Sequence, residues 1–365
     1  QALSRLQGHQ ILAVNRGEKE GFLKVRVELD RDRALQAVRR HVIVPGSAAM
    51  EFIKSAAEDA YDRLIFPALE REARSDLTER ADEGAIGQFA LNLKPLLMQP
   101  PVKGRVTMGL DPGYRMGCKV AVVDATGKVL DTAVVYPTFS QRKKEEAIDA
   151  LAKLIRRHGV AHIAIGNGTA GKETEIFAAE VIRELGGGVQ YMVVSEAGAS
   201  VYSASKLAAE EFPQFDVNLR SAVSIARRLQ DPLAELVKID PKSIGVGQYQ
   251  HDMPQARLDE TLSGVVEDCV NAVGVDLNTA SAPLLSYVAG LNNTTARNIV
   301  KYREENGAFT TRKGVLKVPK LGPKAFEQCA GFLRVPESRN VLDHTGVHPE
   351  SYGAAEALLA LCGYS

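Results

Sequence analysis

The order of apolar runs and helix-forming segments between residues 106 and 194 allows few folds. Three short apolar runs come first, and a regular alternation of helix and strand follows them. A strand meander that leads into alternating helices and strands predicts an α/β domain with a mixed sheet. The predicted strands cover residues 106–110, 118–123, 129–136, 162–165 and 191–194, and the predicted helices cover residues 142–158 and 173–185.

Helix-forming residues dominate the chain from residue 46 to residue 98, ahead of the break at Pro100 and Pro101. Their apolar positions recur at helical spacing, which predicts two amphipathic helices. Nearer the start of the chain, residues 9–14 and 22–29 have the apolar content of two short strands around a polar turn, which predicts a small β-hairpin. The helical stripe that needs a buried partner consists of Phe52, Ile53, Ala56, Ala60, Leu64, Ile65 and Phe66.

Two segments near the end of the chain, residues 288–296 and 318–326, have the pattern of helical hairpins. In each, an apolar residue ends one helix and a tight turn follows. The next helix begins with exposed backbone N–H groups at its positive dipole end, which attracts a phosphate. Gly290 and Asn292 in the first turn and Gly322 in the second are expected to adopt a positive φ. The expected nucleic-acid contacts are Gly290, Asn292, Asn293, Thr294, Arg297, Lys317, Lys320, Gly322 and Lys324.

The distribution of charge supports this interpretation. Residues 282–335 hold nine Lys or Arg against three Asp or Glu, a net charge of +6, whereas the formal net charge of the whole chain is +0. A basic region in an otherwise acidic chain is suited to a polyanionic partner, so we expect RNA or DNA to bind there. The alternative is that the hairpins only pack protein against protein.

Composition excludes several classes of protein. Apolar residues make up 45% of the chain and charged residues 25%, as in soluble globular proteins. No apolar run reaches the roughly 18 to 20 residues of a membrane span, and no signal-peptide pattern is found. We therefore expect a cytoplasmic protein with no membrane partner. The 365 residues predict several domains, and because Gln1 is not an initiator methionine the chain is expected to be a fragment.

Acidic residues mark a candidate catalytic site. Asp111 ends the first predicted strand, Glu196 follows the last one at the same sheet edge if these strands are parallel, and Asp231 precedes a later helical run. Ribonuclease-H-like nucleases hold Mg²⁺ or Mn²⁺ with such carboxylates. All three are candidate catalytic residues, and Asp111 and Glu196 are candidate metal ligands; no other cofactor is expected. The alternative for Asp231 is a helix N-cap, because Pro232 follows it.

A second polar motif lies near the end of the chain. His344 and His348, with Asp343 beside them, have a spacing found in metal sites. Gly346 and Pro349 favour a loop over a rigid helical face, and no third ligand is evident. The segment is therefore predicted to be a surface turn.

Five longer motifs resemble those of the Tex family of bacterial transcription accessory proteins, and the resemblance covers essentially the whole chain. Tex-like proteins comprise a helical N-terminal region, a YqgF-type ribonuclease-H-like domain, a double helix-hairpin-helix module and an OB-fold RNA-binding domain. The motifs are residues 109–119 (GLDPGYRMGCK), 165–170 (IGNGTA), 195–202 (SEAGASVY), 243–252 (SIGVGQYQHD) and 275–280 (VDLNTA).

The resemblance implies a multidomain α and α/β protein. It places a helical region with the short β-hairpin over residues 1–100, a ribonuclease-H-like mixed-sheet domain over 101–250 and a double helix-hairpin-helix module over 251–336. A small helical piece then covers residues 337–365. The glycine-rich β pattern of an OB fold is not found in this chain, so the family's usual RNA-binding domain is expected to be missing from it.

We interpret the chain as the core of a Tex-like transcription accessory factor that binds RNA or DNA through phosphate contacts, without reading bases. RNA polymerase or other transcription components are the expected protein partners. Two alternatives stay open: a metal-dependent nuclease that uses Asp111, Glu196 and Asp231, and a scaffold that only binds proteins. We expect an incomplete site and no robust cleavage, because Asn167 stands where many nucleases of this fold place an acid and Asp231 can serve as an N-cap. The resemblance also makes the triad only a candidate, since the Tex-type YqgF domain is usually regarded as a scaffold.

Overall fold

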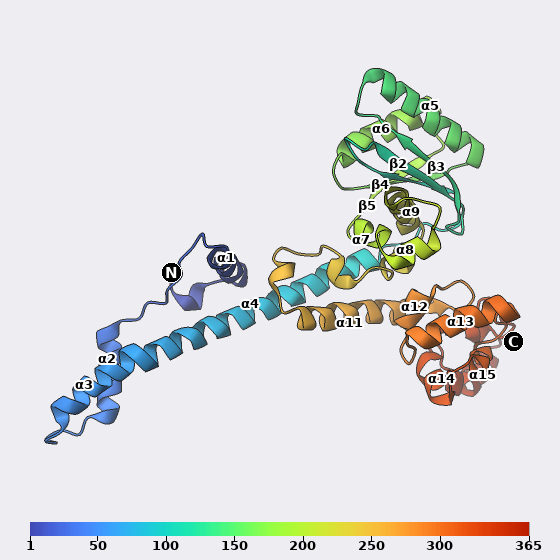
Figure 1. Cartoon of the computed structure of the whole chain (residues 1–365). Coiled ribbons are helices and arrows are strands. Elements are labelled where there is room, and N and C mark those ends of the chain that lie inside the picture. The colour runs from blue at the N-terminus through green and yellow to red at the C-terminus, as the bar shows by residue number, and fades with distance from the viewer. Residues whose placement is uncertain (365) are drawn as a thin grey trace. The chain divides into compact units, whose positions relative to one another are not determined.

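The structure is a computed structural model that describes residues 1–364. These residues form two compact units. The first unit comprises Gln1–Phe89 and Gly247–Leu258, and the second comprises the remaining residues. Figure 1 labels many of the helices and strands along the chain.

The first unit is helical. The predicted β-hairpin is wrong, because residues 9–14 lie inside a helix whose start is capped by reciprocal hydrogen bonds between Gln7 and Gln10. A short apolar run such as this one does not by itself distinguish a strand from a half-buried helix. The helices are α1 (Gly8–Lys19), α2 (Arg31–Val42), α3 (Met50–Ala60) and α4 (Phe66–Leu97), and a π-helical segment (Tyr61–Ile65) joins α3 to α4.

The helices predicted over residues 46–98 are present, but the buried stripe differs from the predicted one. Phe52 and Leu64 are 80% and 64% exposed. A π-helical turn adds residues to the helical repeat and rotates the following face, so one helical period cannot describe both sides of it. The residues that are buried are Ala57, Tyr61, Leu77, Ala81, Ile86, Phe89, Leu93 and Leu97.

The second unit contains the predicted mixed sheet, whose strand order is β3-β2-β1-β4-β5. The first three strands form an antiparallel meander, and β4 and β5 continue the sheet in parallel with β1. The predicted strand boundaries are confirmed to within one residue. The strands are β1 (Thr107–Asp111), β2 (Cys118–Val123), β3 (Val129–Val135), β4 (His162–Gly166) and β5 (Gln190–Val194).

Helices cover both faces of this sheet (Figure 1). On one face, α5 (Gln141–His158) and α6 (Gly171–Glu184) bury a large apolar core with alternate residues of the central strands. On the other face lies α9 (Val217–Gln230). This helix approaches β1 so closely that a Cβ atom added to Gly109 would lie 2.7 Å from the backbone nitrogen of Ala226, and closer still to the carbonyl oxygen of Ala222.

Further helices and one pair of short strands follow the sheet. The two-residue strands β6 (Val275–Asp276) and β7 (Leu333–Arg334) pair in parallel and bracket the hairpin segments. The helices are α7 (Ala199–Ser203), α8 (Lys206–Glu211), α10 (Pro232–Leu236), α11 (Gln255–Val273), α12 (Ala282–Ser286), α13 (Asn293–Asn306), α14 (Pro323–Cys329) and α15 (Tyr352–Leu361).

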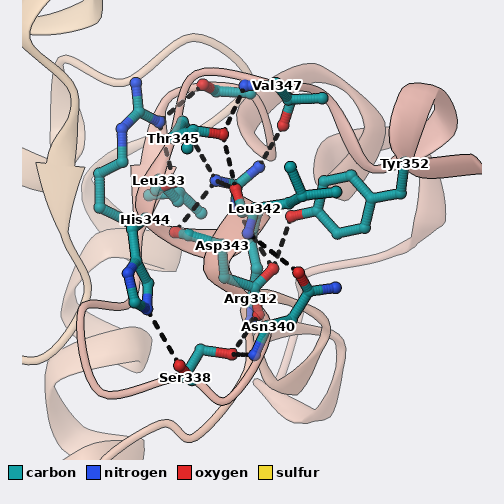
Figure 2. A network of polar contacts seen from close by, with 12 residues as sticks. Arg312, Leu333, Ser338, Asn340, Leu342, Asp343, His344, Thr345, Val347 and Tyr352 are labelled. Atoms are coloured by element: carbon teal, nitrogen blue, oxygen red, sulfur yellow. Dashed lines mark hydrogen bonds and ion pairs between the residues drawn. The ribbon is translucent and has the colours of Figure 1, made fainter. Parts of the chain in front are cut away.

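A buried arginine ties the segment after β7 to the second hairpin (Figure 2). The Arg312 side chain is fully buried, and its Nη1 atom donates to the carbonyl oxygen of Val347 at 2.6 Å. Its Nη2 atom donates to the carbonyl oxygens of Leu342, Asp343 and Thr345 at 3.1, 3.1 and 2.6 Å. One guanidinium therefore satisfies four backbone acceptors of one loop.

The predicted surface turn agrees with the histidines, since His344 is exposed and His348 half-buried, but not with the residue beside them. Asp343 is buried, and it accepts hydrogen bonds from the hydroxyls of Ser338 at 2.7 Å and Tyr352 at 2.5 Å. Burial alone would raise the pKa of Asp343, but these hydrogen bonds and Arg312 hold it below its ordinary value. His344 pairs with the carbonyl oxygen of Ser338 and lies beside this network. Only Asp343 of the polar motif is therefore part of the local core.

Candidate nucleic-acid interface

The two hairpins repeat each other at a spacing of 30 residues, so that Val318 corresponds to Val288. The same turn hydrogen bond occurs in both: Leu291 N–H donates to Val288 O at 3.0 Å, and Leu321 N–H donates to Val318 O at 3.2 Å. Corresponding positions are also buried alike, as shown by Leu285 and Val315, Val288 and Val318, and Ile299 and Cys329.

Each turn of the pair contacts the second helix of the other hairpin. The Asn298 side chain on α13 donates to the carbonyl oxygen of Pro319 at 2.9 Å. In the reciprocal contact, a Cβ atom on Gly290 would lie 2.5 Å from the Cβ of Gln328 on α14. Asn298 and Gln328 are again 30 residues apart. The module is therefore built around an approximate two-fold relation between its hairpins.

The positive φ angles fall partly where they were predicted. Gly290 has a φ of +79°, but Asn292 has a φ of −136° and Gly322 one of −88°, so the prediction is wrong for these two residues. In the second turn the left-handed residue is Lys320, at a φ of +65°. It is the counterpart of Gly290, whereas Asn292 and Gly322 are the N-caps of α13 and α14.

The first turns of α13 and α14 differ in whether a side chain already accepts hydrogen bonds from their backbone N–H groups. The Asn292 side chain accepts the N–H groups of Thr294 and Thr295 at 2.9 and 3.0 Å. The Thr295 hydroxyl oxygen accepts the N–H of Asn292 at 2.8 Å. In the second hairpin Gly322 provides no side-chain cap, and Pro323 has no N–H to satisfy.

The exposed cations are concentrated around the second turn. Residues 282–335 contain nine Lys or Arg residues. Three of them have structural roles, because Arg303, Arg312 and Arg334 donate to backbone carbonyl groups. Lys301 pairs with Glu305 at 3.7 Å. The other exposed cations are Arg297 in the first hairpin and Lys313, Lys317, Lys320 and Lys324 in the second.

The acidic pair lies at the carboxyl-end edge of the sheet. Asp111 is largely buried, and burial raises its pKa to about 6; the Glu196 carboxylate adds to the rise, whereas the Ser221 hydroxyl and the Lys119 ammonium oppose it. Glu196 extends over the loop after β4, since a Cβ atom on Gly168 would lie 2.7 Å from its Oε2 atom. The structure thus brings Asp111 and Glu196 into electrostatic contact.

Asp231 is placed elsewhere. Its carboxylate accepts the N–H of Ala234 at 3.1 Å as the N-cap of α10 and pairs with Lys103 at 2.8 Å. The side chain that faces Asp111 from α9 is Ser221. Throughout residues 1–364, no three His, Cys, Asp or Glu side chains are close enough together to hold a metal ion. The acidic pair with Lys119 beside it therefore fits a divalent cation poorly.

Sequence reasoning missed Lys119 and Arg228 at this edge. Lys119 could have been found, because a β1–β2 meander pairs it directly with Asp111. Arg228 lies on α9, and its Nη1 atom donates to the carbonyl oxygens of Ser195 and Ala197 at 2.8 Å each, which anchors the loop that carries Glu196. No local pattern marks such a contact.

The Asp111→Asn variant should be more stable than the wild type at neutral pH. The pKa of the Asp111 carboxyl group is raised from 3.8 to about 6 in the folded protein. The free energy of unfolding therefore falls as the pH rises between these two values, and it stays lower at higher pH. The expected gain at pH 7.5 is about 1 to 3 kcal/mol, and it should shrink toward pH 4. Urea denaturation at both pH values measures it. Asp149→Asn, on the exposed side of α5, is the control, and an equal effect of Asp111→Asn at both pH values would contradict the raised pKa.

Fold and site together define a class of protein in which a ribonuclease-H-like sheet domain precedes a double helix-hairpin-helix module. Family models agree: residues 1–89 match the Tex central region-like model, 105–230 the Tex protein YqgF-like domain, 270–334 the helix-hairpin-helix motif and 340–365 the HHH domain. The chain belongs to the Tex family.

Its relatives occur in bacteria and animals. The chain is 54% identical to the uncharacterized protein YdcI of Bacillus subtilis, over 100% of this chain and 51% of that protein. It is 53% identical to the transcriptional accessory protein Tex of Neisseria gonorrhoeae, over 98% and 48% of the two chains. It is 46% identical to the human S1 RNA-binding domain-containing protein 1, over 91% and 34%. The chain thus spans about half the length of its bacterial relatives. None of the helices within residues 1–364 is long and apolar enough to cross a membrane.

Proposed function

We propose that this chain binds RNA or DNA through phosphate contacts at its helix-hairpin-helix module, without reading bases, as part of a transcription accessory factor. The observation that carries the proposal is the second hairpin, where Lys317, Lys320 and Lys324 are exposed around a turn whose helix start has no side-chain cap. Ammonium groups and free backbone N–H groups are the donors that bind phosphate oxygens.

The backbone conformation of Lys320 also supports phosphate binding at this turn. A residue with a Cβ atom costs about 1 to 2 kcal/mol in the left-handed region, and the first hairpin avoids this cost with Gly290. Strain of this kind concentrates at functional sites. The exposed ammonium of Lys320 gives the turn a charge that glycine could not supply.

Two relatives support the proposal by their names, which are transcriptional accessory protein Tex and S1 RNA-binding domain-containing protein 1. From the first name we also propose that the chain acts in the cytoplasm with RNA polymerase or other transcription components. The nuclease alternative has weaker support, because Asp231 caps α10 and only Asp111 and Glu196 come together. Mn²⁺-dependent cleavage that disappears in Asp111→Asn would favour that alternative.

Neutralising the second hairpin should weaken binding to unrelated sequences by a similar factor. In the variant Lys317→Gln with Lys320→Gln and Lys324→Gln, each lost phosphate contact should reduce the slope of log affinity against log salt by about 0.7 to 0.9. Fluorescence anisotropy with single- and double-stranded RNA and DNA of two sequences measures both quantities. Lys153→Gln on α5 serves as the control. Unchanged affinity and slope on every probe would move the protein-scaffold interpretation into first place.

A second variant separates binding from stability. Gly322→Asn should add the cap that Asn292 provides in the first hairpin, and there is room for it, because a Cβ atom at Gly322 meets no atom within 4 Å. The new cap should stabilise the module by about 0.5 kcal/mol while it occupies N–H groups otherwise free for phosphate. Stability should therefore rise as affinity falls. A rise in both would show that these N–H groups do not bind phosphate.

A further inference from the structure

The segment between α1 and α2 has the side-chain pattern of a strand but lies in no sheet (Figure 1). Apolar and charged residues alternate along it, as in a strand with two different faces. The apolar set is Leu23, Val25, Val27 and Leu29, and the charged set is Lys24, Arg26, Glu28 and Asp30.

One backbone edge of this segment faces carboxylates of its own unit. The N–H of Val27 donates to Glu70 Oε1 at 2.9 Å, and the N–H of Val25 faces the Glu18 carboxylate. In an extended chain successive N–H groups point to opposite edges. The N–H groups of the residues between and beside them, Lys24, Arg26 and Glu28, therefore lie on the other edge.

That other edge is open. The three residues are exposed, and within residues 1–364 no backbone hydrogen bond is formed by their N–H groups. Unpaired backbone groups in a row are the template to which another extended strand adds. The chemistry of the edge thus specifies its partner as an extended polypeptide.

The sequence of the segment is complementary to itself in one antiparallel register. With Val27 opposite Val27, Arg26 lies opposite Glu28 and Lys24 lies opposite Asp30, so that opposite charges meet at every charged position. On the apolar side Val25 lies opposite Leu29. If the Val27 pair is the non-hydrogen-bonded type, its N–H points away from the partner strand, which agrees with the bond to Glu70.

We propose that a second copy of this chain docks here by antiparallel pairing of residues 24–30 around Val27. The pairing is isologous, since one edge meets the same edge of its copy. Because a two-stranded pairing is marginal on its own, the dimer is weak and depends on protein concentration. Moving the register by two residues would place Arg26 opposite Arg26, which disfavours that alternative.

A charge-reversal exchange tests the proposal by analytical ultracentrifugation up to about 100 µM, a range suited to a small interface. Wild type should dimerise as its concentration rises. Arg26→Glu and Glu28→Arg should each dimerise at least about tenfold more weakly, because like charges then meet in both copies. An equimolar mixture of the two variants should dimerise again, since each negative pair then faces a positive pair. Lys153→Glu, which changes charge elsewhere, should leave dimerisation intact.

Three outcomes would overturn the proposal. Wild type could stay monomeric over the whole range, the single reversals could leave the dimer intact, or the mixture could fail to restore it. Amide hydrogen exchange provides a further readout, with exchange at Lys24, Arg26 and Glu28 expected to slow as the dimer forms. Slow exchange in a monomer would show that the chain covers this edge itself and would equally refute the proposal.

Discussion

The Arg312→Met variant is expected to lose about 3 to 5 kcal/mol of stability in the hairpin module, because a buried charge whose Nη1 and Nη2 atoms are hydrogen-bonded is removed from one side of its network. Methionine fills similar space but leaves the carbonyl groups of Leu342, Asp343, Thr345 and Val347 without their donor. It also leaves the buried Asp343 carboxylate without its nearest cation. Figure 2 shows that these groups converge on the one guanidinium.

Hydrogen exchange of amides in α13 and α14 measures the loss locally, which suits a chain with more than one unit. Arg339→Met is the matched control, because Arg339 is exposed in the same segment. The control should change stability by less than about 0.5 kcal/mol. An equally small effect of Arg312→Met would mean that the network contributes little to the module.

The Gly109→Ala variant should destabilise the sheet domain by more than about 3 kcal/mol. Its Cβ atom would overlap the backbone of α9 at Ala222 and Ala226, and backbone atoms cannot move aside as a flexible side chain can. The helix would have to lift from β1, which would loosen the core around Ala121, Val123 and Ile225. Denaturant unfolding followed by a probe in this domain measures the effect.

A second glycine-to-alanine variant is the control, and its expected change in stability has the opposite sign. Gly84 lies within α4, and a Cβ atom there would meet no atom within 4 Å. Gly84→Ala should therefore stabilise its helix by about 0.5 to 1 kcal/mol. If Gly109→Ala behaved like Gly84→Ala, the close approach of α9 to β1 would be refuted.

The strands and helices of the sheet domain could be predicted from sequence because their signals are local. Apolar alternation and helix-forming runs repeat over a few residues, and the predicted boundaries differ from the observed ones by two residues at most. The same local logic fails where one pattern fits two structures. Residues 9–14 are apolar enough for a strand, but their capping and their burial against the rest of the unit make them helical.

The candidate sites were only partly predictable for a related reason. The positions of both hairpin turns follow from their glycine and asparagine residues, yet the left-handed residue of the second turn is Lys320. A lysine carries no signal for positive φ, and only the structure shows that Val318 and Leu321 on either side of it are buried. The sequence indicated that Asp231 could be an N-cap, but it could not decide between this role and a place in the site of Asp111. The position of α10 in the structure decides it, because Asp231 caps that helix.

Sequence alone determined what depends on neighbours along the chain: the order of strands and helices in the sheet domain, the two hairpin segments, their excess of positive charge and the family resemblance. Tertiary structure alone decided what depends on residues far apart. It made Arg312 and Asp343 a buried pair, brought Ser221 rather than Asp231 to Asp111, and left Gly109 no room for a side chain. The physical reason is that burial and close approach arise from contacts between distant segments, whose energies are set by three-dimensional packing and leave no periodic trace in the sequence.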